Sequence, residues 1–149
     1  MPATNASTTS DGFTAEERAA MKERAAELRA EGKKGAKQAD GLQAVLDAIA
    51  KMEEEDRALA ERVHVTITST APQLVPKTWY GMPSYANADG KAVIFFQESG
   101  KFKSRYSTLG FNDDAKLDDG DLWPVAYALI DWNSDVEQKV VALVKAAVS

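Results

Sequence analysis

The sequence contains no cysteine, and this absence removes several classes of chemistry. Without thiols the chain forms no disulfide, offers no thiolate nucleophile, and cannot bind zinc or an iron–sulfur cluster through sulfur. Basic residues are also in the minority, with 18 Lys and Arg against 23 Asp and Glu and a formal net charge of −5. An acidic chain is repelled by phosphate backbones, so nucleic acid is not an expected partner.

Long apolar runs are missing too. No run approaches the roughly 18 residues of a membrane-spanning helix, and the N-terminus lacks the basic and apolar segments of a secretory signal. We therefore expect a cytoplasmic protein without a membrane partner. With 149 residues, of which 44% are apolar, the chain is long enough to enclose one core.

Motifs for catalysis are equally scarce. The glycines are scattered as single turn residues and form no phosphate-binding loop. The sequence has one histidine, His64, and no motif for a serine nucleophile that it could activate. Its position in the expected helix places it at the rim of the buried face of that helix. We expect a binding protein without a tightly bound cofactor rather than an enzyme.

The N-terminal part of the chain is polar and charged. Residues 1–12 are small and aperiodic, which predicts a flexible tail. Thr14 and Glu17 form a capping box, and the good helix formers that follow predict a helix over residues 15–30. Its apolar stripe is narrow, so weak docking is expected. The stripe consists of Met21, Ala25 and Leu28.

A Gly- and Lys-rich segment, residues 32–37, separates this helix from the rest of the chain. Such a composition breaks helices and stays solvated. It predicts a boundary, with a tail, an accessory charged helix and a linker in residues 1–37. Residues 38–149 are then the folded domain.

Three further helices are expected in that domain. The first has apolar residues every three or four positions between Leu42 and Met52, the second runs from Glu54 to about Thr70, and the third begins at Ser134. The apolar positions of the first are Leu42, Val45, Leu46, Ile49 and Met52.

Between these helices, β-branched and aromatic residues with frequent turn signals predict a sheet. A two-residue turn at Ser99-Gly100 would pair the neighbouring strands. The expected fold is α+β, an antiparallel sheet of about five strands packed with N-terminal and C-terminal helices. The candidate strands are residues 77–81, 84–86, 91–98, 101–108 and 123–129.

The aromatic string around Gly81 is a candidate ligand site. Trp79, Tyr80 and Met82 offer apolar surface, while Gly81 and Pro83 favour a kink that lets a ligand approach the backbone. The alternative is a strand kink whose aromatic side chains fill the core.

Alternating cations follow on the expected strand 101–108. Lys101, Lys103 and Arg105 would point to one face, where they suit the phosphate or carboxylate of a small anionic ligand. The alternative is that they protect an exposed strand and lay their stems over apolar neighbours.

Two acidic segments are candidates for a metal site. A bound hard cation reduces the repulsion between neighbouring carboxylates, so we expect that these segments could bind iron weakly. The second segment does not match the calcium-loop template, and solvated acidic surface is the alternative. The candidate ligands are Glu54, Glu55, Asp113, Asp114, Asp118, Asp119 and Asp121.

Residues 40–149 resemble the YdhG-like family of small bacterial domains. The resemblance is carried by Tyr80-Gly81-Met82-Pro83, by the Phe95-Phe96 strand and by the basic-aromatic segment from Lys101 to Phe111. It implies a compact frataxin-like α+β fold, and parts of that family carry the description of iron chaperone.

Three hypotheses remain open at this point. The first is a cation-binding protein that delivers iron or another hard cation. The second is a small-molecule module that uses the aromatic string and the cations. The third is a protein interaction domain whose helix 15–30 is a detachable contact for a partner.

Overall fold

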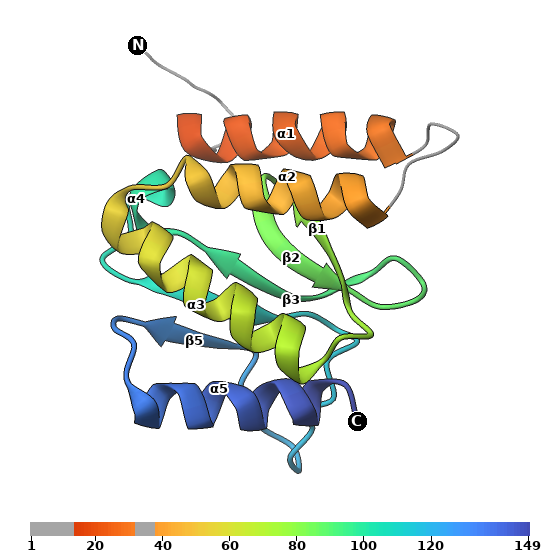
Figure 1. Cartoon of the computed structure of the whole chain (residues 1–149), viewed down its shortest axis with the longest axis vertical. Helices are drawn as coiled ribbons and strands as arrows, with labels where there is room; N and C mark the ends of the chain where they lie inside the picture. Colours follow the sequence, from red (N-terminus) through yellow and green to blue (C-terminus); the bar gives the residue numbers. More distant parts are fainter. Residues whose placement is uncertain (1–13, 32–37) are drawn as a thin grey trace.

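The computed structural model describes residues 14–31 and 38–149, and within these residues the chain forms an antiparallel sheet and five helices (Figure 1). The α+β class is confirmed. The predicted tail, residues 1–12, and the linker, residues 32–37, lie outside the described residues. None of the helices in the described part is long and apolar enough to cross a membrane.

The sheet is a simple meander in which each strand pairs with the next one along the chain. Its order is β1-β2-β3-β4-β5, with every pair antiparallel. The cross-strand partners of Ile94 are Tyr85 and Phe111, and all three side chains are buried in the core. The strands are β1 (Val75–Trp79), β2 (Met82–Ala86), β3 (Ala92–Gln97), β4 (Ser107–Phe111) and β5 (Ala126–Leu129).

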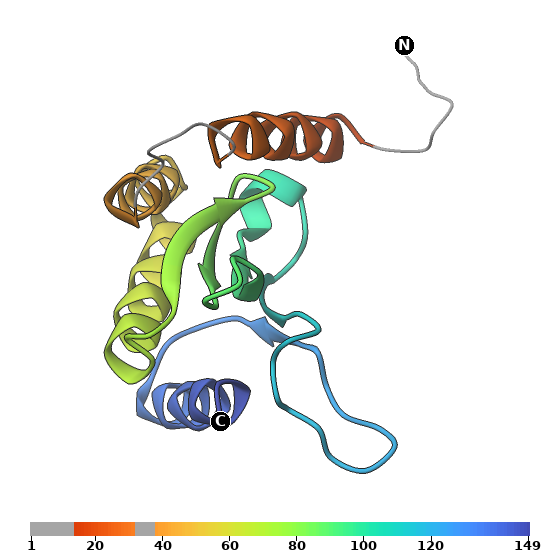
Figure 2. The same ribbon diagram turned by 90° about the vertical axis from the view of Figure 1, so that its right-hand side faces the viewer.

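Three helices cover one face of this sheet (Figure 2). Val63 and Ile67 of α3 and Val144 of α5 are fully buried, as expected for amphipathic helices packed on a sheet. Helix α5 is capped by Asn133, whose side-chain oxygen accepts a hydrogen bond from the backbone N–H of Val136 at 2.9 Å. The three are α2 (Gln38–Ala50), α3 (Glu54–Thr70) and α5 (Ser134–Ala147).

Helix α2 buries a narrower face than its spacing predicts. Val45 and Ile49 are buried, whereas Leu42 and Leu46 are 37% and 41% exposed. The helix lies against β1 at the sheet edge, and a Cβ at Gly41 would come within 2.5 Å of the Pro76 carbonyl oxygen. Such close contact on one side leaves the flanking leucines in solvent.

Helix α1 (Ala15–Glu31) begins where the capping box predicts. The Thr14 hydroxyl accepts from the N–H of Glu17 at 3.0 Å, and the Glu17 carboxylate accepts from the N–H of Thr14 at 2.9 Å. Of the predicted stripe, Met21 and Ala25 are exposed, and the side chain of Leu28 lies outside the described part of the structure; Ala20 is buried instead. The helix lies over the turn between β1 and β2 and over α4 (Ser99–Phe102).

The predicted strand 101–108 is wrong. Residues 99–102 form the short helix α4, Lys103 closes it with a left-handed φ of 55°, and β4 begins only at Ser107. The two-residue turn at Ser99-Gly100 is therefore wrong as well. The cause is tertiary, because the buried carboxylate of Asp56 accepts hydrogen bonds from the Ser99 hydroxyl and the Gly100 N–H, both at 2.8 Å.

Candidate functional site

The turn between β1 and β2 is the centre of the candidate site. Trp79 pairs with Met82, so Tyr80 and Gly81 form a two-residue hairpin turn. Both have positive φ, 54° and 77°, which is the type I′ pattern. An L-residue in this conformation costs about 1 kcal/mol, so Tyr80 is a mildly strained position that its surroundings must stabilise.

Glu27 of α1 supplies that stabilisation. Its two carboxylate oxygens accept hydrogen bonds from the backbone N–H groups of Tyr80 and Gly81, each at 3.0 Å. Successive backbone N–H groups in such a turn form a concave anion-binding nest. Charge-assisted hydrogen bonds of this kind contribute about 1.5–3 kcal/mol each when they are shielded from water. The nest is therefore occupied by a carboxylate of the same chain.

Two more carboxylates of α1 contact cations beside this turn. Glu23 pairs with Lys101 at 2.6 Å, and Glu16 pairs with Lys103 at 3.0 Å. The pairing with Lys103 lowers the pKa of Glu16, chiefly through the hydrogen bond between the two side chains. These pairs are partly exposed and are screened by salt. The docked face of α1, which we call the acidic stripe, consists of Glu16, Ala20, Glu23 and Glu27.

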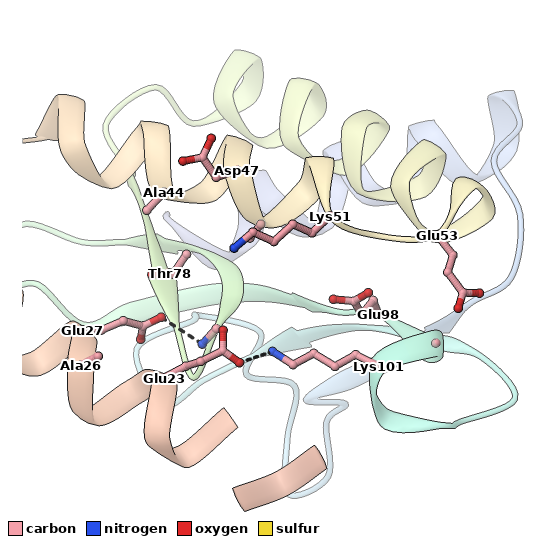
Figure 3. A pocket seen from close by; sticks show the side chains of 13 residues that line it. Glu23, Ala26, Glu27, Ala44, Asp47, Lys51, Glu53, Thr78, Glu98 and Lys101 are labelled. Carbon is pink, nitrogen blue, oxygen red and sulfur yellow. Dashed lines mark hydrogen bonds and ion pairs between the residues drawn. The ribbon is translucent and has the colours of Figure 1, made fainter. Parts of the chain in front are cut away.

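A cleft of about 670 Å³ opens between α1, α2, the β1–β2 turn and α4 (Figure 3). The side chain of Lys51 extends into it from the end of α2, and that of Glu98 from the segment before α4 (Figure 3). Its walls carry five carboxylates and two ammonium groups, a formal difference of −3. The carboxylates are Glu23, Glu27, Asp47, Glu53 and Glu98, and the ammonium groups are those of Lys51 and Lys101.

Glu98 is the carboxylate most affected by this environment. Its half-buried position raises its pKa, and the nearby charges of Asp56, Glu23 and Glu53 raise it further, against the attraction of Lys101. A bound cation would relieve this repulsion. Glu98 is therefore the side chain whose ionisation best reports what enters the cleft.

The aromatic string lies beside the cleft. Trp79 packs edge-on against Tyr80 with ring centroids 4.8 Å apart, and its ring lies 5.2 Å from that of Phe95. Met82 is only 6% exposed, so little of its surface is open to a ligand. Of this string, the cleft is lined by Gly81 alone.

The three predicted cations do not share a face, because they do not lie on one strand. Lys101 and Lys103 come together under the acidic stripe of α1. Arg105 instead lies over the Tyr106 ring and lines a second cleft, about 610 Å³ in volume, near the start of α3.

The predicted metal ligands lie in different parts of the fold. Glu54 and Glu55 are exposed in the first turn of α3, whereas Asp113 and Asp114 follow β4. Asp114 accepts a hydrogen bond from the Asn87 side chain at 2.8 Å. Within residues 14–31 and 38–149 there is no group of three or more His, Cys, Asp or Glu side chains that could hold a metal ion. The remaining candidates, Asp118, Asp119 and Asp121, are exposed on the loop that leads to β5.

His64 lies at the rim of the buried face of α3, as predicted. Its Nδ1 lies 2.9 Å from the hydroxyl of Tyr85, which is fully buried and whose pKa is strongly raised by that burial. Partial burial lowers the pKa of His64 below 6.5, because it disfavours the imidazolium.

We expect the free energy of unfolding to fall as the pH drops below about 6.5, since the unfolded chain then binds a proton that the folded chain resists. NMR titration of the His64 ring measures this pKa directly. The His64→Gln variant should lose this part of the pH dependence. A ring that titrates above 6.5 would contradict the role of burial.

Several residues of the cleft were not predicted from the sequence. Glu23 and Glu27 belong to a helix that was considered only as a contact for a partner, and Glu98 to a strand that was given no functional role. Asp47 lies on α2, which was expected only to pack, and Lys51 directly follows that helix. One signal was present, because positions 16, 20, 23 and 27 share one face of a helix. The spacing alone does not reveal what that face contacts.

Comparison with protein-family models, with curated proteins and with solved structures finds no match to this chain. The resemblance to the YdhG-like family and the frataxin-like description therefore stay predictions.

Proposed function

We propose that the chain is a binding protein, with no turnover of its own, that holds an organic cation with several amino groups in the cleft between α1 and α2. The observation that carries the proposal is the excess of carboxylates around a cleft of about 670 Å³. Oligoamines carry their positive charges at intervals along a flexible chain, which suits carboxylates distributed over several walls.

Distribution of charge is also the reason to favour an amine over iron. A hard metal ion needs several oxygen ligands at about 2.0–2.6 Å from one point. The cleft carboxylates come from α1, α2, the residue before α3 and the residue before α4. Three of them are already engaged, Glu23 by Lys101, Glu27 by the β1–β2 turn and Asp47 by the Gln43 side-chain amide. Iron delivery, which the acidic segments suggested, is the competing form of the cation hypothesis.

The test is calorimetric titration of the full chain with spermine, a linear tetraamine, and separately with ferrous iron under anaerobic conditions. Solvent-exposed ion pairs contribute about 0.2–1 kcal/mol each, so four of them contribute at most about 4 kcal/mol and we expect a spermine Kd of ~1 mM or higher at low salt. Glu98→Gln should weaken binding about threefold, because one contact of that size is lost. Asp113→Asn, which removes the same charge from an exposed loop, is the matched control and should bind as the wild type does.

The pH dependence gives an independent check. Protonated Glu98 does not attract a cation, so spermine affinity should rise as the pH increases through the raised pKa of Glu98. This part of the pH dependence should be missing in Glu98→Gln. The proposal fails if spermine binds wild type and Glu98→Gln equally, or if ferrous iron binds and spermine does not.

A further inference from the structure

We propose that the surface beneath α1 is a docking site for an acidic helix of a partner protein, and that α1 occupies this site as an internal substitute. The surface consists of the Tyr80 and Gly81 N–H groups, Lys101 and Lys103. Each of these groups contacts one carboxylate of the acidic stripe. The occupant and the surface are therefore charge-complementary along the length of the stripe.

The contacts of α1 favour displacement over permanent attachment. Among the described side chains of α1, residues 14–27, only Ala20 is buried, and Met21 is 43% exposed. The helix is held instead by ion pairs, by the carboxylate on the β1–β2 turn and by Arg24, whose guanidinium lies 5.8 Å from the centroid of the Tyr80 ring. Another helix with the same pattern of charges can reproduce these interactions. A helix with little apolar burial is only marginally stable by itself, so its place on the core depends on these charged contacts.

The geometry also defines the partner. Glu16, Glu23 and Glu27 stand at positions i, i+7 and i+11, which lie on one face of a helix. A competing segment needs carboxylates at the same three positions and a small residue at i+4, where Ala20 fits against the core. Because α1 belongs to the same chain, it competes at a high effective concentration, and a free partner must bind more tightly or be present in excess.

The test uses the full chain and a fluorescent peptide with the sequence of residues 14–31 as the probe. In the Glu16→Gln, Glu23→Gln, Glu27→Gln chain the internal occupant loses its charges while the surface keeps its own. We expect this variant to bind the peptide at least tenfold more tightly than wild type at low salt, with the amide signals of Tyr80 and Gly81 shifting on binding. A control peptide with the same three changes should not bind.

Two further results decide the proposal. Adding Lys101→Glu and Lys103→Glu to the triple variant should abolish peptide binding while circular dichroism shows a folded chain. Equal peptide affinity in wild type and the triple variant would overturn the proposal. Peptide affinity that is unchanged by Lys101→Glu and Lys103→Glu would overturn it as well.

A wild-type dimer with exchanged α1 helices would assign the surface to a second copy of the chain and would overturn the choice of partner. Spermine binding is not needed for any of these outcomes, so the failure of one proposal is distinguishable from the failure of the other.

Discussion

Replacement of Asp56 by alanine is expected to lower the free energy of unfolding by about 3 kcal/mol. Asp56 is 4% exposed, and its carboxylate accepts three hydrogen bonds, from the hydroxyls of Ser99 and Ser107 and from the N–H of Gly100. Alanine would leave these donors without their acceptor, and each unsatisfied donor that stays shielded from water costs about 1–3 kcal/mol. Ser107 is buried, whereas Ser99 is half-buried and Gly100 is exposed, so the expected loss lies at the lower end of the sum.

Urea denaturation of Asp56→Ala beside Glu55→Ala measures this effect. Glu55 lies in the same turn of α3 and is exposed, so its replacement removes the same charge without a buried network and should cost less than about 0.5 kcal/mol. Asp56→Asn keeps the shape and one acceptor oxygen, and an intermediate loss is expected. Equal stability of the two alanine variants would contradict a stabilising role of the Asp56 hydrogen bonds.

Replacement of Gly110 by alanine is expected to destabilise the fold by about 2–3 kcal/mol through overpacking. Gly110 faces Phe95 across β3 and β4, and an added Cβ would lie 2.1 Å from the Cζ of the Phe95 ring. The ring also contacts Trp79, with centroids 5.2 Å apart, so it cannot move without disturbing that contact.

A double-mutant cycle with Phe95→Leu isolates this clash. Leucine is smaller and can bend away from position 110, so Gly110→Ala should cost at least 1 kcal/mol less in the Phe95→Leu background. Chemical denaturation of the four proteins gives the coupling free energy. Strictly additive effects would mean that the ring does not explain the need for glycine.

The fold class was predictable because its signals are local. The capping box at Thr14, the spacing of Val63 and Ile67 and the Asn87-to-Gly90 turn all act over a few residues, and each is present. The Asn87 side chain accepts from the N–H groups of Asp89 and Lys91, at 3.0 and 3.1 Å, which closes the turn within five residues. Patterns of this length depend little on the rest of the chain.

The errors occur where distant residues decide the local structure. Residues 99–102 turn into helix α4 because Asp56, some 44 positions earlier, holds the N–H of Gly100. Tyr80 adopts a left-handed backbone that Asn or Gly usually provides, and a carboxylate of α1, 53 positions away, holds its N–H. The candidate site combines the same two regions, so its cleft was not predictable from either segment alone.

The most direct test of the account is a map of backbone amide shifts in the full chain during titration with spermine. We predict that the perturbed amides belong to the walls of the cleft, around Glu23, Lys51 and Glu98, and that the acidic loop from Asp113 to Asp121 stays unperturbed. Shifts confined to that loop, or no shifts at all, would contradict the claim that the space between α1 and α2 is the binding site.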